Sequence, residues 1–247
     1  MSGWDTSDIP DQSGRTIIVT GANSGLGAAT TRALVAAGAE VIMACRDEVK
    51  ARAVADSIGG DRVQVRRLDL ADLSSVREFA GGIDGADVLI NNAGVMAVPR
   101  RRTADGFEMQ FGTNHLGHFA LTGLLLDKIA DRVVTLSSLM HMIGRIDLAD
   151  PNYQQRSYER WRAYGQSKLA NLMFARELQR RLAAAGSAKL SLAAHPGYAA
   201  TELQSHTESF MDTVMVLGNR LVAQSAEMGA LPSLYAATSP DARPGGF

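Results

Sequence analysis

Tyr164 and Lys168 have the residue types and the spacing of an acid/base pair. Side chains four positions apart lie on one face of a helix, so the phenol and the ammonium can face the same cleft. A free tyrosine has a pKa of about 10 and is a poor base at pH 7, but a nearby cation favours the phenolate and lowers that value. Tyr153 and Tyr158 lack a lysine at this spacing. The pattern predicts that Tyr164 transfers protons and that Lys168 lowers its pKa.

A glycine-rich turn, Thr20 to Gly27, follows a short apolar run and precedes a helical pattern. Gly21 permits a sharp exit from a strand, and Gly25 and Gly27 leave no side chain where a diphosphate has to approach. A helix that begins near Gly25 points free N–H groups and its positive dipole end at the phosphates. The spacing is G-x-x-x-G-x-G, not the commoner G-x-G-x-x-G. The turn predicts a dinucleotide site; the alternative is a turn without a ligand.

The end of the second expected strand indicates which dinucleotide binds. An NAD site places an acid there for the ribose 2′-hydroxyl, whereas Arg46 suits a 2′-phosphate, with Asn23 and Ser24 as neutral donors from the glycine turn. Asp47 is the competing candidate for NAD, although an aspartate directly before Glu48 is typical of a helix N-cap. We predict NADP as the cofactor, with NAD as the less favoured one.

These residues have to be positioned by the elements around them, and short apolar runs alternate with longer helical patterns along the chain. The runs are continuous, which is typical of strands in a sheet that helices cover on both faces. The order predicts one α/β domain: a doubly wound parallel sheet, or Rossmann fold, in three layers with right-handed crossovers. We expect strands at 15–19, 40–44, 62–68, 88–90, 132–136 and 189–193, and helices at 25–37, 48–58, 73–80, 106–126 and 161–184.

The remaining segments are assigned around this domain. Residues 1–13 are predicted to be a polar N-terminal tail, and 14–247 to be the domain. The irregular, polar stretch 139–160 and the segment 198–224 are expected to form loops over a substrate site. Apolar residues at helical spacing between Phe210 and Val222 predict a lid or a helix packed on the body.

Composition excludes several classes of protein. Of the 247 residues, 46% are hydrophobic and 21% are charged, which is ordinary for a globular chain. A net charge of -1 provides no basic field for nucleic acid or an anionic membrane. The single cysteine, Cys45, excludes an internal disulfide framework, and the histidines show no metal-binding pattern. No signal peptide or membrane-spanning run stands out, so we expect a cytoplasmic protein with a small-molecule substrate, no metal, and no nucleic-acid or membrane partner.

Four motifs in this order resemble the short-chain dehydrogenase/reductase family: the Thr20 to Gly27 turn, Asn91-Asn92-Ala93-Gly94, Ser137-Ser138, and Tyr164 with Lys168. The resemblance covers roughly residues 14–237. Three further segments resemble the branch that contains retinol dehydrogenases and WW-domain oxidoreductases, namely Ala44 to Asp47, Ala163 to Asn171 and His195 to Gly197. Two features depart from the family: the long spacing of 26 positions between Ser138 and Tyr164, and an end at Phe247 where relatives continue into a final strand.

The resemblance implies catalytic roles by position. Tyr164 would be the general acid/base, and Lys168 would lower its pKa and bond the nicotinamide ribose. Ser138 would hold the carbonyl or alcohol oxygen, with Ser137 as the structural alternative. Asn114 matches the catalytic asparagine that supports a water-linked proton path; the alternative is a helix asparagine that bonds the backbone.

The resemblance also implies cofactor contacts. Asp69 and Leu70 would contact the adenine, Pro196 and Gly197 would wall the nicotinamide, and Thr201 would bond its carboxamide. The other expected cofactor residues are Gly21, Asn23, Ser24, Gly25, Leu26, Gly27, Arg46, Asn91, Ala93, Gly94, Tyr164 and Lys168.

A group of apolar side chains near these motifs predicts a lipophilic substrate pocket, because methionine adapts to irregular ligands; the alternative is that some are ordinary core residues. The expected pocket residues are Met96, Met140, Trp161 and Tyr198, with Val95, Met142, Ile143 and Leu203 around them. We therefore expect an NADP(H)-dependent oxidoreductase that moves a hydride between a nicotinamide cofactor and a lipophilic alcohol or carbonyl. The alternative is a non-catalytic dinucleotide-binding regulatory or scaffolding protein. The resemblance further implies a homo-oligomer that pairs helices 106–126 and 161–184.

Overall fold

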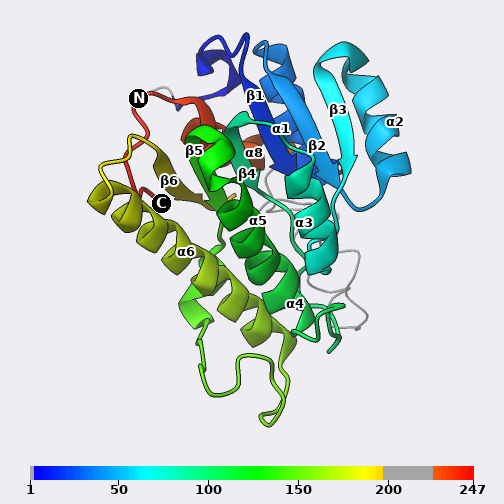
Figure 1. Ribbon diagram of the computed structural model, residues 1–247, viewed down its shortest axis with the longest axis vertical. Helices are drawn as coiled ribbons and strands as arrows, with labels where there is room; N and C mark the ends of the chain where they lie inside the picture. Colours follow the sequence, from blue (N-terminus) through cyan, green and yellow to red (C-terminus); the bar gives the residue numbers. More distant parts are fainter. Residues whose placement is uncertain (1–2, 197–224) are drawn as a thin grey trace.

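Six parallel strands form the centre of the computed structural model, which describes residues 3–196 and 225–247 (Figure 1). Their order across the sheet is β3-β2-β1-β4-β5-β6. The order reverses between β1 and β4, and ligands of doubly wound folds bind at such a switch point. The strands are β1 (Thr16–Thr20), β2 (Glu40–Cys45), β3 (Val63–Arg67), β4 (Ala86–Asn91), β5 (Ile129–Leu136) and β6 (Leu190–Ala194).

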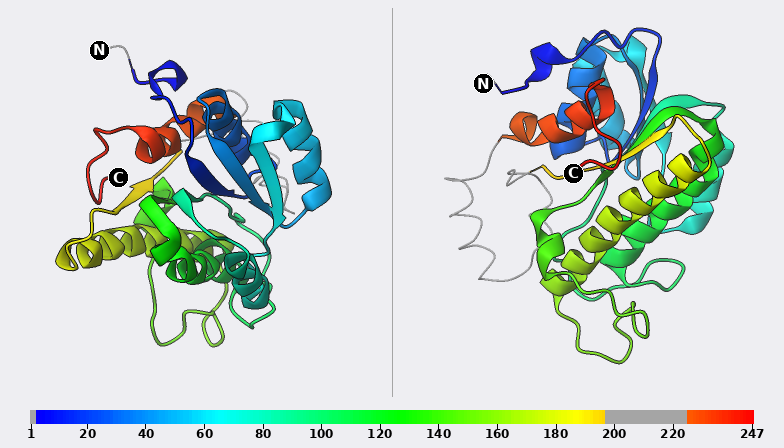
Figure 2. Two further views of the ribbon diagram at one scale, coloured as in Figure 1. Left: turned by 45° about the horizontal axis from the view of Figure 1, so that its top comes forward. Right: turned by 90° about the vertical axis from the view of Figure 1, so that its left-hand side faces the viewer.

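Helices cover both faces of this sheet, as Figure 2 shows. Side chains alternate along a strand, so Ile17 and Val19 of β1 join one buried cluster and Ile18 joins another. The first cluster packs against α1 (Gly25–Ala36), α2 (Glu48–Ile58) and α8 (Ala226–Thr238). The second packs against α3 (Leu73–Gly81), α5 (Gly117–Leu125) and α6 (Arg160–Ala184). The predicted three-layer Rossmann fold is confirmed.

The expected helix at 106–126 is the prediction that differs most from the structure. Gly106 has a φ of +85° and precedes the helix. The helical region begins with α4 (Met109–Phe111), continues as a π-helix (Gly112–Leu116) and returns to α-helix only in α5. Wide π turns occur often at functional sites. Helix α8 lies beyond the last predicted element, and it contains Pro232 although proline disfavours a helix interior.

The segment expected to be a polar tail packs on the domain where the structure describes it. A short 3₁₀ turn (Thr6–Asp8) follows Trp4, whose ring meets that of Tyr235 edge-on at 5.5 Å. Gln12 is buried, and its backbone N–H donates to the Ala37 carbonyl at 2.8 Å. These contacts make residues 4–12 part of the domain.

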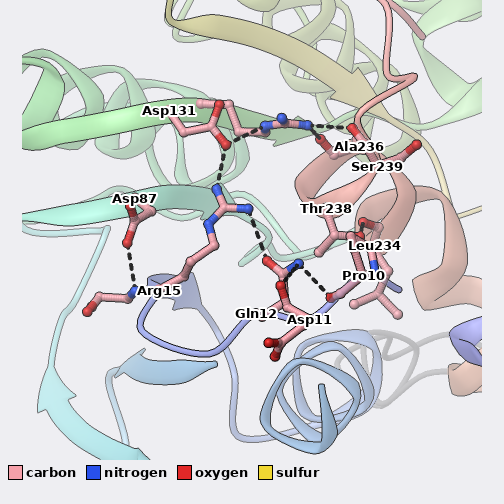
Figure 3. A network of polar contacts seen from close by, with 12 residues as sticks. Pro10, Asp11, Gln12, Arg15, Asp87, Asp131, Leu234, Ala236, Thr238 and Ser239 are labelled. Atoms are coloured by element: carbon pink, nitrogen blue, oxygen red, sulfur yellow. Dashed lines mark hydrogen bonds and ion pairs between the residues drawn. The ribbon is translucent and has the colours of Figure 1, made fainter. Parts of the chain in front are cut away.

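A network of polar contacts around Asp131 links the segment before β1 and the end of α8 to β5 (Figure 3). Arg132 on β5 donates to the carbonyls of Ala236 and Ser239 at 3.1 and 3.0 Å, where α8 ends. A cation suits the carbonyl end of a helix. Its neighbour Asp131 pairs with both Arg132 and Arg15, the residue before β1. No helix in the described ranges is long and apolar enough to cross a membrane.

Candidate active site

The glycine turn after β1 lets three chain segments approach one another closely. Gly21 has a φ of +64°, and a Cβ atom there would lie 2.9 Å from the Cα of Ala93. A Cβ on Gly27 would lie 2.2 Å from the Gly21 carbonyl oxygen. Side chains at these positions would push α1 and the loop after β4 away from the turn.

A cavity of about 440 Å³ opens at the carboxyl ends of β1, β2 and β4, within the size range of cofactor sites. The N-terminus of α1 borders it, and Ser24 makes no side-chain bond to the first turn of that helix. The free N–H groups therefore make an anion site, which fits a dinucleotide. Eleven of the expected cofactor residues line the cavity: Gly21, Asn23, Ser24, Gly25, Leu26, Gly27, Arg46, Asp69, Leu70, Ala93 and Gly94.

Asn91 was expected at the cofactor, but the cavity is lined by its neighbour Asn92, so a contact of Asn91 with the cofactor stays a prediction. The side chain of Asn91 donates to the hydroxyls of Thr122 and Thr135 at 2.9 and 3.3 Å, on the face of β4 that α5 covers. Asn92 donates to the Thr20 carbonyl at 2.8 Å. Consecutive residues of an extended chain face opposite ways, and sequence did not show which one faces the ligand.

Arg46 and Asp47 at the end of β2 are exposed and line the same cavity. Asp47 is the N-cap of α2, because its carboxylate accepts from the Lys50 N–H at 3.0 Å. That N-cap interpretation is confirmed. Lys50 lines the cavity beside Arg46 and was missed. Its position in the first turn of a helix that begins at the cavity was the signal that could have identified it.

Tyr164 and Lys168 lie one turn apart on α6 and are both buried. The Lys168 Nζ lies 5.7 Å from the centre of the Tyr164 ring and donates to the Leu136 carbonyl, at the end of β5, at 3.1 Å. Ser138 lies close to the Tyr164 hydroxyl, and it opposes the rise in pKa that burial causes there. The expected shared helix face therefore exists, and Ser138 approaches it from the segment after β5.

The pKa values of the pair are governed by burial. Burial raises the pKa of Tyr164 to about 12, against the opposing effect of Ser138. Burial lowers the pKa of Lys168 to about 8. In this structure the ammonium of Lys168 is directed at the Leu136 carbonyl and burial penalises the phenolate, so the lowering of the Tyr164 pKa by Lys168 stays a prediction. Tyr164 is therefore protonated at neutral pH.

The structure separates the two serines that follow β5. Ser138 begins a 3₁₀ helix (Leu139–Ile143), where its Oγ accepts from the Met140 N–H at 3.3 Å and lies close to the Tyr164 hydroxyl. Ser137 is buried and donates to the Lys168 carbonyl at 2.8 Å. Ser137 thus fastens α6 to the sheet, and Ser138 faces the tyrosine.

Two glycines bring this 3₁₀ helix against α6. A Cβ on Gly165 would lie 2.7 Å from the Met140 carbonyl oxygen, and one on Gly144 would lie 2.3 Å from the Gly165 oxygen. Backbone therefore packs on backbone beside Tyr164, which keeps Ser138 within reach of the phenol.

Asn114 lies in the π-helix and is fully buried. Its Oδ1 accepts from the Val95 N–H at 2.8 Å, and its Nδ2 donates to the Val95 carbonyl and the Ser167 hydroxyl, both at 2.9 Å. Its own carbonyl accepts from Asn171 at 3.0 Å. The side chain therefore holds the loop after β4, which matches the backbone-bonding alternative; the water-linked proton path stays a prediction.

The residues expected around the substrate and the nicotinamide differ in where the structure places them. Met96, Met140 and Trp161 are half-buried, and their role in a pocket stays a prediction. Pro196 lines a second cavity of about 710 Å³ between β6 and α8. The expected residues Gly197, Tyr198, Thr201 and Leu203 lie outside the described part of the chain, as do the loop expected at 198–224 and the lid or helix expected between Phe210 and Val222.

Known proteins share these features. The family model for short chain dehydrogenase matches residues 15–212. Human retinol dehydrogenase 13 is 48% identical over 92% of this chain and 72% of its own length. Mouse polyprenol dehydrogenase is 42% identical over 94% of this chain and 74% of its own length.

A solved structure is similar in both sequence and fold. It is a crystal structure of an uncharacterized protein from Mycobacterium paratuberculosis, 56% identical, with a TM-score of 0.84 over 96% of this chain and 81% of that one. The motifs in the sequence, the switch-point cavity and these similarities agree. The chain belongs to the short-chain dehydrogenase family, in its retinol-dehydrogenase-like branch, and is a nicotinamide-dependent oxidoreductase.

Proposed function

We propose that the protein is an NADP(H)-dependent oxidoreductase of lipophilic alcohols or carbonyls, with Tyr164 as the acid/base. The proximity of Ser138 to the buried Tyr164 carries the proposal, because it places a proton donor and an oxygen-binding hydroxyl side by side. Lys168 lies near Gly94, a lining residue of the switch-point cavity: a Cβ there would be 3.7 Å from its Nζ.

The chain's own residues manage the oxygen and the proton of the substrate. When bound, a nicotinamide supplies or accepts the hydride. Ser138 donates a hydrogen bond to the carbonyl oxygen, and Tyr164 gives that oxygen its phenolic proton during reduction and takes it back during oxidation. Burial raises the pKa of Tyr164 to about 12, so its protonated form is available for reduction throughout the neutral range.

Two further observations support the choice of cofactor and substrate. Arg46 and Lys50 both line the cavity, and two cations suit a 2′-phosphate better than a 2′-hydroxyl. Met140 follows Ser138 closely in the 3₁₀ helix, and Trp161 lies in the first turn of α6 ahead of Tyr164, so apolar groups flank the acid/base. The names retinol and polyprenol, which the relatives carry, denote apolar alcohols.

The test is NADPH consumption with a panel of lipophilic aldehydes and ketones, in wild type and Tyr164→Phe. We expect Tyr164→Phe to lose about 10²–10⁴-fold in kcat, because only the transferable proton is removed. NADPH fluorescence should show that cofactor binding survives. Tyr153→Phe is the matched control, since Tyr153 is buried in the loop before α6 and makes no bond to Ser138 or Lys168 in the structure.

Two outcomes would contradict the proposal. Activity of Tyr164→Phe above about one tenth of wild type would remove Tyr164 from the chemistry. NADPH binding by wild type without turnover of any substrate would favour the non-catalytic alternative.

A further inference from the structure

We propose that Gln110 is a positioning residue that sets the distance between the cofactor cavity and the acid/base Tyr164. The inference rests on the proposed function for its catalytic consequence. Gln110 lies in α4 and belongs to no motif that the sequence analysis identified. It ties together three segments that are far apart in the chain: the loop after β4, the loop before α6, and α6 itself.

The Gln110 side chain is completely buried, and both its oxygen and its nitrogen are hydrogen-bonded. Its Oε1 accepts from the Ala97 N–H at 2.8 Å. Its Nε2 donates to the Arg160 carbonyl at 2.8 Å and to the Tyr158 hydroxyl at 2.9 Å. The amide orientation is unambiguous, because the Ala97 group can only donate and the Arg160 group can only accept.

Ala97 is held in an unusual conformation at one end of this tie. It has a φ of +50°, which is uncommon for a residue other than glycine, and it is fully buried. Such a conformation persists only where surrounding contacts impose it. The side-chain Oε1 of Gln110 accepts from the buried Ala97 N–H. Without this acceptor the Ala97 N–H would be unpaired, and the loop could relax to another conformation.

The same loop is clamped a second time, two residues earlier. Asn114 lies four positions after Gln110 and bonds both backbone groups of Val95. Val95 lines the cofactor cavity. The side-chain amides of Gln110 and Asn114, one turn apart, therefore hold Ala97 and Val95. These bonds fix this wall of the cavity to the helical segment that carries both amides.

The other end of the tie reaches the turn that carries the acid/base. Arg160 is the first residue of α6. In an α-helix the carbonyl of residue i accepts from the N–H of residue i+4, so the Arg160 carbonyl is the partner of the Tyr164 amide. Gln110 therefore bonds the oxygen that anchors Tyr164, and a change at Gln110 shifts the phenol relative to the cavity wall.

Tyr158 strengthens this arrangement, because its hydroxyl donates to the Val98 carbonyl at 2.9 Å. Glu108 is buried beneath it and accepts from the N–H groups of Gln110 and Phe111 at 2.9 and 2.7 Å, which caps α4. Glu108 and Tyr158 are the titratable groups in contact with Gln110, and burial raises the pKa of both.

The first experiment compares Gln110→Glu with wild type and with Gln179→Glu. A carboxylate at position 110 can still accept from Ala97 but cannot donate to Arg160 or Tyr158. Gln179 is the matched control on the same helix as Tyr164, because only its oxygen is used, accepting from the Ser191 N–H at 2.7 Å. Each kcat is divided by the folded fraction measured by circular dichroism.

We expect Gln110→Glu to lose about 10- to 100-fold in kcat at pH 8, since displacing a catalytic group by about 1 Å has effects of that size. The NADPH dissociation constant should stay within about threefold of wild type. As pH falls to 6, kcat relative to wild type should recover at least threefold, because a buried carboxyl with a raised pKa takes up a proton and donates again. Gln179→Glu should match wild type throughout.

Gln110→Met provides a second route if the buried carboxylate impairs folding. Methionine is unbranched and of similar length, and it removes all three bonds without adding a charge. It should show the same loss in kcat without recovery at low pH. An unchanged kcat per folded molecule in both variants would overturn the proposal.

Hydrogen exchange tests the tie without any turnover. Peptides covering residues 95–98 and 160–164 should exchange faster in Gln110→Met than in wild type, while a peptide from β1 stays unchanged. Unchanged exchange in both segments would refute the tie. If wild type turns over no substrate, the proposed function fails, and hydrogen exchange still decides whether Gln110 holds the two segments together.

Discussion

Ser137 and Ser138 are neighbours in the chain but contact different partners. Ser137 donates to the Lys168 carbonyl inside the domain, and Ser138 lies close to the phenol of Tyr164. Ser138 opposes the rise in the pKa of Tyr164 that burial causes. Ser137 therefore has a structural contact, and Ser138 is placed for the proposed chemistry.

Alanine substitutions should separate these two roles. We expect Ser138→Ala to lower kcat by roughly 10²-fold, the typical cost of losing a hydrogen-bond donor to a reacting oxygen. Ser137→Ala should keep kcat and lower the free energy of unfolding by about 1 kcal/mol. Steady-state kinetics and urea unfolding measure both effects. The opposite assignment would hold if Ser137→Ala lost the activity.

Arg46 should control the choice of cofactor. A charged hydrogen bond contributes about 1.5–3 kcal/mol, but Arg46 is exposed, so we expect the low end. Arg46→Ala should lower the ratio of kcat/KM for NADP over NAD by about tenfold. Arg52→Ala is the control, because Arg52 is an exposed arginine of α2 that pairs with Glu48. An unchanged ratio in Arg46→Ala would show that Arg46 is only a surface residue.

At the scale of elements, the site depends on backbone packing between α6 and the 3₁₀ helix that Ser138 begins. The contact runs through Gly165 and the Met140 carbonyl, where no side chain fits. Gly123 in α5 is the natural comparison, because a Cβ there meets nothing within 4 Å. A side chain is therefore excluded at Gly165 and has room at Gly123.

The same substitution at these two glycines should have opposite effects on stability. Gly165→Ala should lower the free energy of unfolding by about 1–3 kcal/mol through overpacking, and should lower kcat because Ser138 moves away from Tyr164. Gly123→Ala should raise stability by about 0.5–1 kcal/mol, the difference in helix propensity. Urea unfolding measures both. Equal effects at both sites would contradict the packing argument.

At the scale of the whole molecule, α5 and α6 cover one face of the sheet (Figure 2), and some of their apolar side chains are exposed. Phe119 is 55% exposed, Met173 is 55% exposed and Leu124 is 47% exposed. The rings of Phe119 and Phe174 lie 5.4 Å apart, which joins the two helices into one surface. A contiguous exposed apolar surface is typical of an interface.

We expect this surface to pair with a second copy in a two-fold dimer. Light scattering at micromolar concentration should give about twice the 26.3 kDa of one chain. Phe119→Glu should produce the monomer, because it buries a charge in the interface. Leu148→Glu is the control, since Leu148 is 88% exposed on the loop before α6. A wild-type mass of one chain would refute the dimer.

The sequence by itself determined the features that depend on local periodicity. The order of strands and helices, the glycine turn at the start of α1, and the shared face of Tyr164 and Lys168 follow from continuous apolar runs and from spacings of three to four residues. The N-cap at Asp47 was likewise visible, because capping involves only the next few residues.

Only the tertiary structure decided which way side chains face and how deeply they are buried. Asn92 rather than Asn91 borders the cavity, Ser138 rather than Ser137 faces Tyr164, and the pKa of Tyr164 rises instead of falling. Adjacent residues are equivalent candidates in sequence, and packing between distant segments chooses between them. Desolvation likewise depends on every element that closes over a group, so no local spacing reveals its size.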